Sequence, residues 1–112
     1  MPVVTEHAIF ILASLAGGER HGYGIAKEVE ELSDGAVHLT AGTLYGALTR
    51  LSADGLIAET REEVVGGRRR RYYELTSAGQ AVLGEEVELL HSKAAALSAR
   101  TRSLSPRKPR PA

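Results

Sequence analysis

Four consecutive arginines, Arg68 to Arg71, are the densest group of side chains in this sequence that could do chemistry. Arginine can hold a phosphate through two parallel hydrogen bonds or enter a narrow minor groove, so the run indicates a nucleic-acid partner. A run of charges alone is more often only a solvated surface. Here Gly66 and Gly67 precede the arginines, and strand-like residues lie on both sides of the glycines. This pattern predicts a β-hairpin with the arginines on its return strand.

A second group of small and polar residues begins a predicted helix just before the hairpin. Thr40 is a good N-cap, and Ala41 with the leucines at 44, 48 and 51 forms the face that we expect to point inward. Small residues at a helix N-terminus let its backbone approach DNA bases, and hydroxyls can donate to phosphate oxygens. We therefore predict that this helix enters the major groove. The predicted DNA-binding residues are Thr40, Gly42, Thr43, Tyr45, Thr49, Arg50, Arg68, Arg69 and Arg70.

Two of these residues, and the neighbouring Arg71, have plainer interpretations. Gly42 could serve only in helix initiation, and Tyr45 could be a half-buried residue at the edge of the core. Strand alternation places Arg71 on the same face as Leu75, which we expect to face the core. Arg71 could therefore pair with an acidic side chain instead of binding DNA.

No enzyme or metal site assembles from the sequence. The four histidines are scattered and lack the spacing of metal ligands. The chain has no cysteine, which excludes a disulfide framework and a thiolate metal site. The acidic residues at 85, 86 and 88 fall on an exposed helix and indicate solubility rather than acid–base catalysis. We expect no catalytic activity, no metal and no cofactor.

The charge of the chain is zero overall but unevenly distributed. Residues 61–71 carry five arginines against Glu62 and Glu63, and residues 100–112 carry five basic residues and no acidic one. Local fields steer binding, so a neutral total is compatible with DNA. The 112 residues suffice for one domain, and we recognise neither a signal peptide nor a segment long enough to span a membrane. We expect a soluble cytoplasmic protein with no membrane partner.

The elements that must position these residues form a predicted winged helix-turn-helix, mostly α with a small β wing. Helices are expected at 5–16 and 21–32, the second with Ile25, Val29 and Leu32 as its core stripe. Residues 36–39 could form a short strand that pairs with the wing. The wing strands are expected at 56–63 and 68–75, joined through 64–67. The predicted domains are a DNA-binding domain at 1–79, a dimerisation helix at 80–102 and a disordered basic tail at 103–112.

The last predicted helix begins after Thr76 and carries a heptad pattern of apolar residues. Such a seam is typical of a coiled coil. The helix could instead lie on its own domain, but it is too long for so small a core, so we predict a homodimer. The first helix, apolar nearly all round, also suggests contact with a partner subunit. The predicted dimerisation residues are Leu83, Val87, Leu90, Ala94 and Leu97.

Four motifs in order make the sequence resemble the PadR family of bacterial winged-helix transcriptional regulators. They are HGY at 21–23, TAGTLY at 40–45, LSADGLI at 51–57 and RRYYELT at 70–76, within a similarity that spans about residues 9–83. The resemblance implies a homodimer, usually a repressor, that binds a palindromic promoter site and dimerises through a single C-terminal helix. It also implies that Tyr23 lies at the DNA. Gly46 departs from the family, in which a larger and often basic residue is frequent.

Two other functions stay open at this point. One is a winged-helix module that binds proteins and not DNA, and the other is a multidrug sensor of the same fold with a small-molecule effector. Some short members of the family bind flat aromatic drugs between Trp residues at the dimer interface, but this chain has no Trp. The clustered arginines and small helix residues favour double-stranded DNA as the main partner.

Overall fold

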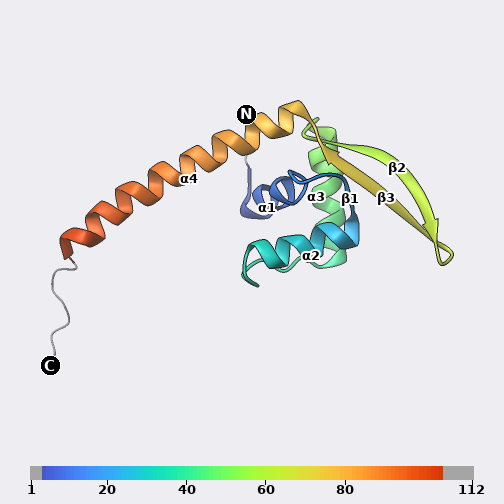
Figure 1. Ribbon diagram of the computed structural model, residues 1–112, viewed down its shortest axis with the longest axis horizontal. Helices are drawn as coiled ribbons and strands as arrows, with labels where there is room; N and C mark the ends of the chain where they lie inside the picture. Colours follow the sequence, from blue (N-terminus) through green and yellow to red (C-terminus); the bar gives the residue numbers. More distant parts are fainter. Residues whose placement is uncertain (1–3, 105–112) are drawn as a thin grey trace, which may run out of the picture.

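The computed structural model describes residues 4–104, which form four helices and three strands (Figure 1). The predicted class, mostly α with a small antiparallel sheet, is confirmed. The helices are α1 (Glu6–Ser14), α2 (Gly22–Leu32), α3 (Ala41–Ala53) and α4 (Ser77–Leu104). The strands are β1 (Arg20–His21), β2 (Ile57–Val65) and β3 (Arg68–Leu75). We call β2, β3 and the turn between them the wing.

Side-chain caps fix where the helices begin. The hydroxyl oxygens of Thr5, Thr40 and Thr76 each accept a hydrogen bond from the backbone N–H three residues on, at 3.1, 3.3 and 3.0 Å. These bonds satisfy backbone donors that have no partner inside the helix. Each threonine therefore caps its helix, as predicted for Thr40. The cap of α2 is His21, whose Nδ1 accepts from the N–H of Gly24 at 3.2 Å.

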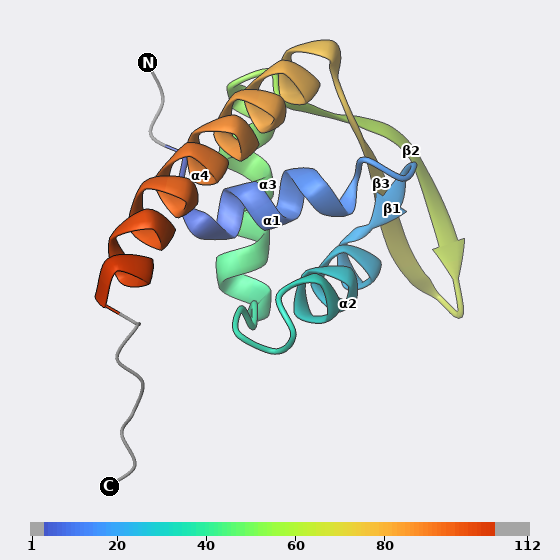
Figure 2. The same cartoon turned by 60° about the vertical axis from the view of Figure 1, so that its left-hand side comes forward.

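The core is built from the apolar faces of the first three helices and the base of the sheet. Figure 2 shows α1 crossing α3, with α4 and α2 on either side of α1. Two residues predicted to face inward do not. Leu32, the last residue of α2, is 47% exposed, and Ala41, the first residue of α3, is exposed beside a groove next to α2. Both stand at helix ends, beyond the contact between helices. The buried residues include Ile11, Leu12, Ile25, Val29, Leu44, Leu48, Leu51, Leu56, Ile57 and Tyr73.

The sheet has the order β1-β3-β2 and is antiparallel throughout. The short strand predicted at 36–39 is wrong, and β1 takes its place as the third strand. Ser33 Oγ accepts from the N–H of Val37 at 2.9 Å, so this backbone donor is not available to a sheet. Residues 36–39 instead form an irregular connection that buries Val37 and Leu39.

A tight turn and a bulge shape the wing. Gly66 and Gly67 have φ of 59° and 79°, the positive values that a two-residue hairpin turn requires at both central positions. The turn is therefore shorter than predicted, and the residues at 64 and 65 extend β2. The register shifts between Glu59, opposite Tyr73, and Arg61, opposite Tyr72. Thr60 is the extra residue of this bulge.

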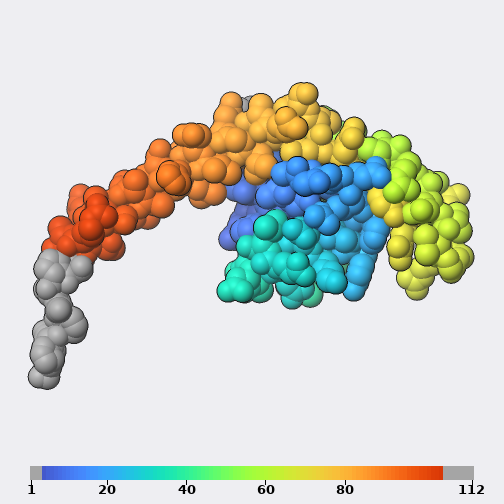
Figure 3. All heavy atoms as spheres, viewed as in Figure 1, coloured from blue at the N-terminus to red at the C-terminus, as the bar shows by residue number. Residues whose placement is uncertain are grey.

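Helix α4 touches the body only near its start. Val82 and Leu83 pack against the core, and the backbone of Leu56 lies so close to Gly79 that a side chain there would overlap it. Beyond this contact α4 projects away from the body, on the side opposite the wing (Figure 3). The helix reaches Leu104, so the first two residues of the predicted tail are helical, and residues 105–112 lie outside the described part of the chain. The predicted domain boundaries stay a prediction.

Candidate nucleic-acid interface

The side of α3 that faces away from its buried leucines is exposed, and no other part of the described protein covers it. All six residues predicted to bind DNA from this helix and its cap are exposed. A Cβ atom added at Gly42 or at Gly46 would meet nothing within 4 Å. The backbone of α3 can therefore be approached closely from outside along two consecutive turns.

The hydroxyls on α3 are partly engaged within the helix. Thr40 Oγ1, already the cap, shares a hydrogen bond of 3.1 Å with Thr43 Oγ1. Thr49 Oγ1 donates to the backbone carbonyl of Tyr45 at 2.9 Å. Thr49 must therefore rotate before it can donate to a phosphate, whereas its oxygen can still accept. A hydrogen bond from the Thr49 hydroxyl to DNA would therefore require the loss of its bond to Tyr45.

A groove of about 550 Å³ separates α3 and the start of α2 from the wing. Tyr23 and Tyr45 form one wall and are 73% and 52% exposed. The arginines of β3 form the other wall. We call this the wing groove. Its lining residues are His21, Gly22, Tyr23, Tyr45, Arg68, Arg69, Arg70 and Arg71.

Three other predicted residues of α3 lie on the opposite flank of the helix. Gly42, Thr43 and Arg50 line a second groove, of about 280 Å³, together with Thr5 and His7 from the start of α1. Thr40 and Thr49 are exposed but line neither groove, and the structure divides the other predicted residues between two sides of α3. Tyr23, Tyr45 and the arginines share one side, and the residues beside α1 share the other.

Acidic residues of β2 lie opposite arginines of β3 in the wing. Glu62 of β2 lies 3.7 Å from Arg71 Nε and 3.7 Å from Arg69 Nη1, so the expected acidic partner of Arg71 is present. The carboxylate of Glu59, followed by a hydrogen bond involving Tyr73, raises the pKa of Arg71. The structure shows no ion pair for Arg68 or Arg70 within residues 4–104. These last two cations are the most available to a phosphate.

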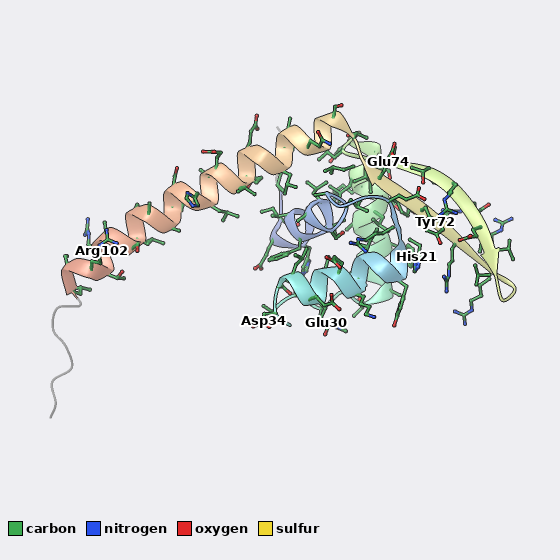
Figure 4. The ribbon with its side chains drawn as sticks, in the orientation of Figure 1. His21, Glu30, Asp34, Tyr72, Glu74 and Arg102 are labelled. Carbon is green, nitrogen blue, oxygen red and sulfur yellow. The ribbon has the colours of Figure 1, made fainter. Side chains whose placement is uncertain are left out.

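His21 belongs to this site, although it was not among the residues predicted to bind DNA. Its imidazole lines the wing groove and lies edge-on to the ring of Tyr72, with centroids 5.4 Å apart (Figure 4). Burial, and then the charge of Arg70, lower the pKa of His21. A neutral imidazole suits the cap, because Nδ1 must be unprotonated to accept from Gly24. The position of His21 directly before a helical GYG segment was a signal for this role, although His is not a common cap.

Other kinds of site do not assemble in the part of the chain that the structure describes. In residues 4–104 no three His, Cys, Asp or Glu side chains are grouped so that they could hold a metal ion. No helix within the same residues has both the length and the apolar character needed to cross a membrane.

Similarity to known proteins agrees with this geometry. Residues 11–85 match the model of the transcriptional regulator PadR-like family. The chain is 41% identical over 86 residues, 77% of each chain, to the transcriptional regulator Rv3488 of Mycobacterium tuberculosis. It superposes on a transcriptional regulator from Clostridium thermocellum with a TM-score of 0.69 and 26% identity, covering 81% of this chain and 88% of that chain. For Bacillus subtilis PadR in complex with operator DNA the TM-score is 0.63 and the identity 26%, covering 70% of this chain and 45% of that chain.

Proposed function

This chain belongs to the PadR-like family of transcriptional regulators, and we propose that it represses transcription by binding palindromic promoter DNA as a homodimer. It has the DNA-binding winged-helix fold of that family and is a regulator rather than an enzyme. As a regulator of transcription it would work in the cytoplasm, where bacterial DNA lies. The observation that carries the proposal is the exposed side of α3, which lies beside a groove lined by arginines.

The two sides of α3 suit the two phosphate backbones that border a major groove. With the N-terminus of α3 against the base edges, Tyr23, Tyr45 and the wing arginines would meet one backbone and the adjoining minor groove. Thr43 and Arg50 would meet the other backbone. In this arrangement Gly42 faces the bases, where the absence of a side chain lets the helix approach.

The exposed part of α4 supports the homodimer. Leu83 is half-buried against its own domain, but Val87, Leu90 and Leu97 of the same heptad seam are exposed, Leu97 to 68%. Covering such a seam with the same seam of a second copy would remove apolar surface from water. A two-fold dimer would place two α3 helices in successive major grooves, about 10 base pairs apart or a multiple of that. We therefore propose a palindromic site.

Two experiments test the proposal. The purified protein first selects duplexes from a random pool, and transcription is then measured from a promoter that carries the selected site. Gly42→Leu should unfold at the normal temperature and lose site-specific binding, because the new side chain blocks close approach of α3. Gly84→Leu is the matched control, since it adds the same side chain at an exposed helical glycine of α4. Retained specific affinity in a folded Gly42→Leu dimer would show that α3 is not the reading helix. Unchanged or increased transcription on addition of the protein would contradict repression.

A further inference from the structure

A carboxylate in the body of the protein holds the base of the wing. Glu19 lies between α1 and β1, 42 residues before its partner Arg61. Its Oε2 accepts from Arg61 Nε at 2.7 Å, and its Oε1 accepts from Thr60 Oγ1 at 2.7 Å. Both hydrogen bonds connect the body to β2, the strand of the wing that does not pair with β1.

The bulge makes this double contact possible. Neighbouring residues of a regular strand point to opposite faces of the sheet, so one carboxylate could not bind both. Thr60 is the additional residue at the register shift, and a bulge re-aims side chains of the bulged strand. Thr60 and Arg61 therefore both reach Glu19.

The contacts continue across the wing toward its groove. The Arg61 guanidinium carbon lies 3.8 Å from the centroid of the Tyr72 ring. The Tyr72 hydroxyl donates to Glu63 Oε1 at 2.6 Å. On its other side Tyr72 meets the edge of His21, which lines the wing groove (Figure 4). A chain of contacts thus runs from Glu19 to the groove.

We propose that Glu19, Thr60, Arg61 and Tyr72, the wing-base network, set the angle of the wing and so the width of the wing groove. None of the four residues lines that groove, so they are positioning residues rather than DNA contacts. Beyond β1 the wing has only two strands, and a two-stranded hairpin alone is marginally stable. The inference rests on the proposed function, because the groove is taken to receive DNA.

The expected effect on affinity follows from the fraction of time that the wing is in place. If loss of the network leaves each wing correctly placed about one third of the time, the apparent affinity falls about threefold per wing. For a dimer with two wings the loss is about ninefold. The dependence of binding on salt should not change, because loss of the network removes no cation that contacts DNA.

Glu19→Gln is the test variant, because Gln keeps the size of the side chain but turns one acceptor oxygen into a donor that faces Thr60 or Arg61. Thr60→Val removes the hydrogen bond from the Thr60 hydroxyl to Glu19 without a change of charge. Glu31→Gln is the matched control, since it removes the same charge from an exposed residue near the end of α2. Stability should change little in each variant, because the contacts at Glu19 are exposed.

The chain has no cysteine, so the cysteines of Val64→Cys at the wing tip and Lys27→Cys on α2 can carry a pair of spin labels. Labelled protein is mixed with excess unlabelled chain, so that distances within one subunit dominate. Glu19→Gln and Thr60→Val should broaden the distribution of distances, and Glu31→Gln should not. A distribution like that of the wild type in both test variants would overturn the proposal.

Binding to a random-sequence duplex of about three helical turns gives the second readout. We expect Glu19→Gln and Thr60→Val to lower the affinity about ninefold, with the same slope of log affinity against log salt concentration as the wild type. A broadened distribution with unchanged affinity would overturn the link between wing angle and DNA, and a reduced slope would assign a direct DNA contact instead. Failure of the wild type to bind any duplex would contradict the proposed function, while the label distances still decide whether the network holds the wing.

Discussion

Removal of the two arginines without ion pairs gives the sharpest test of how the wing binds DNA. Arg68 and Arg70 line the wing groove, and the structure shows no carboxylate paired with either within residues 4–104. Arg69 and Arg71 instead share Glu62. The double variant Arg68→Gln/Arg70→Gln should therefore remove from each wing the two cations that no carboxylate pairs with.

The size of the effect can be worked out from the charges. Each neutralised phosphate contributes about −0.9 to the slope of log affinity against log salt concentration. Two arginines in each of two wings would thus reduce the slope by about 3.6. Between about 50 and 200 mM salt, the wild type should weaken roughly two orders of magnitude more than the variant.

Fluorescence anisotropy of a labelled duplex, titrated at several salt concentrations, measures the two slopes. Arg100→Gln/Arg102→Gln is the matched control, because it removes the same charges at the end of α4 opposite the wing (Figure 4). The control should keep the slope of the wild type. An unchanged slope in a folded Arg68→Gln/Arg70→Gln protein would refute the reasoning and show that the wing does not touch phosphate.

Four further variants test the packing, the cap of α2 and the dimer. Gly79→Ala should lower the free energy of unfolding by about 1–3 kcal/mol, because the added methyl overlaps backbone of the core, whereas Gly84→Ala in open space should raise it by up to about 1 kcal/mol; equal urea midpoints would contradict this. Burial lowers the pKa of His21, so the unfolded state binds more protons and stability should fall as the pH drops below about 6.5. His21→Asn keeps a cap and should reduce this pH dependence in urea unfolding, and an unaltered dependence would place its origin elsewhere. Leu90→Glu should give monomers or unfolded chain in sedimentation, and an intact dimer would exclude the proposed seam.

Features that depend on neighbouring residues could be predicted from the sequence. The threonine caps, the inward leucines of α3 and the paired glycines of the wing turn each follow from a few adjacent positions. The helix faces were predicted least well at their ends, as at Leu32 and Ala41, because periodicity does not say where a neighbouring helix stops.

Features that depend on distant residues could not be predicted. A two-residue strand such as β1 has no periodicity, and its pairing with β3 joins residues about fifty positions apart. Neither the bulge at Thr60 nor the pairing of Glu19 with Arg61 has a signal in local composition. Candidate residues for the interface on α3 could be predicted from the sequence, but their arrangement around two grooves depends on where α1 and the wing lie. Their contacts with DNA stay predictions.

The order of the sheet also bears on aggregation. β2 is an edge strand, because β3 lies between it and β1. An edge exposes unpaired backbone groups to which a strand of another chain can add, and bulges and charged side chains oppose such addition. β2 has both from Thr60 to Glu63, so its acidic residues keep foreign strands away as well as pairing with arginines. This protection ends at the exposed Val64 and Val65, next to the tip, so apolar substitutions at Glu62 and Glu63 would lengthen the apolar edge and make the wing a site of strand addition between molecules.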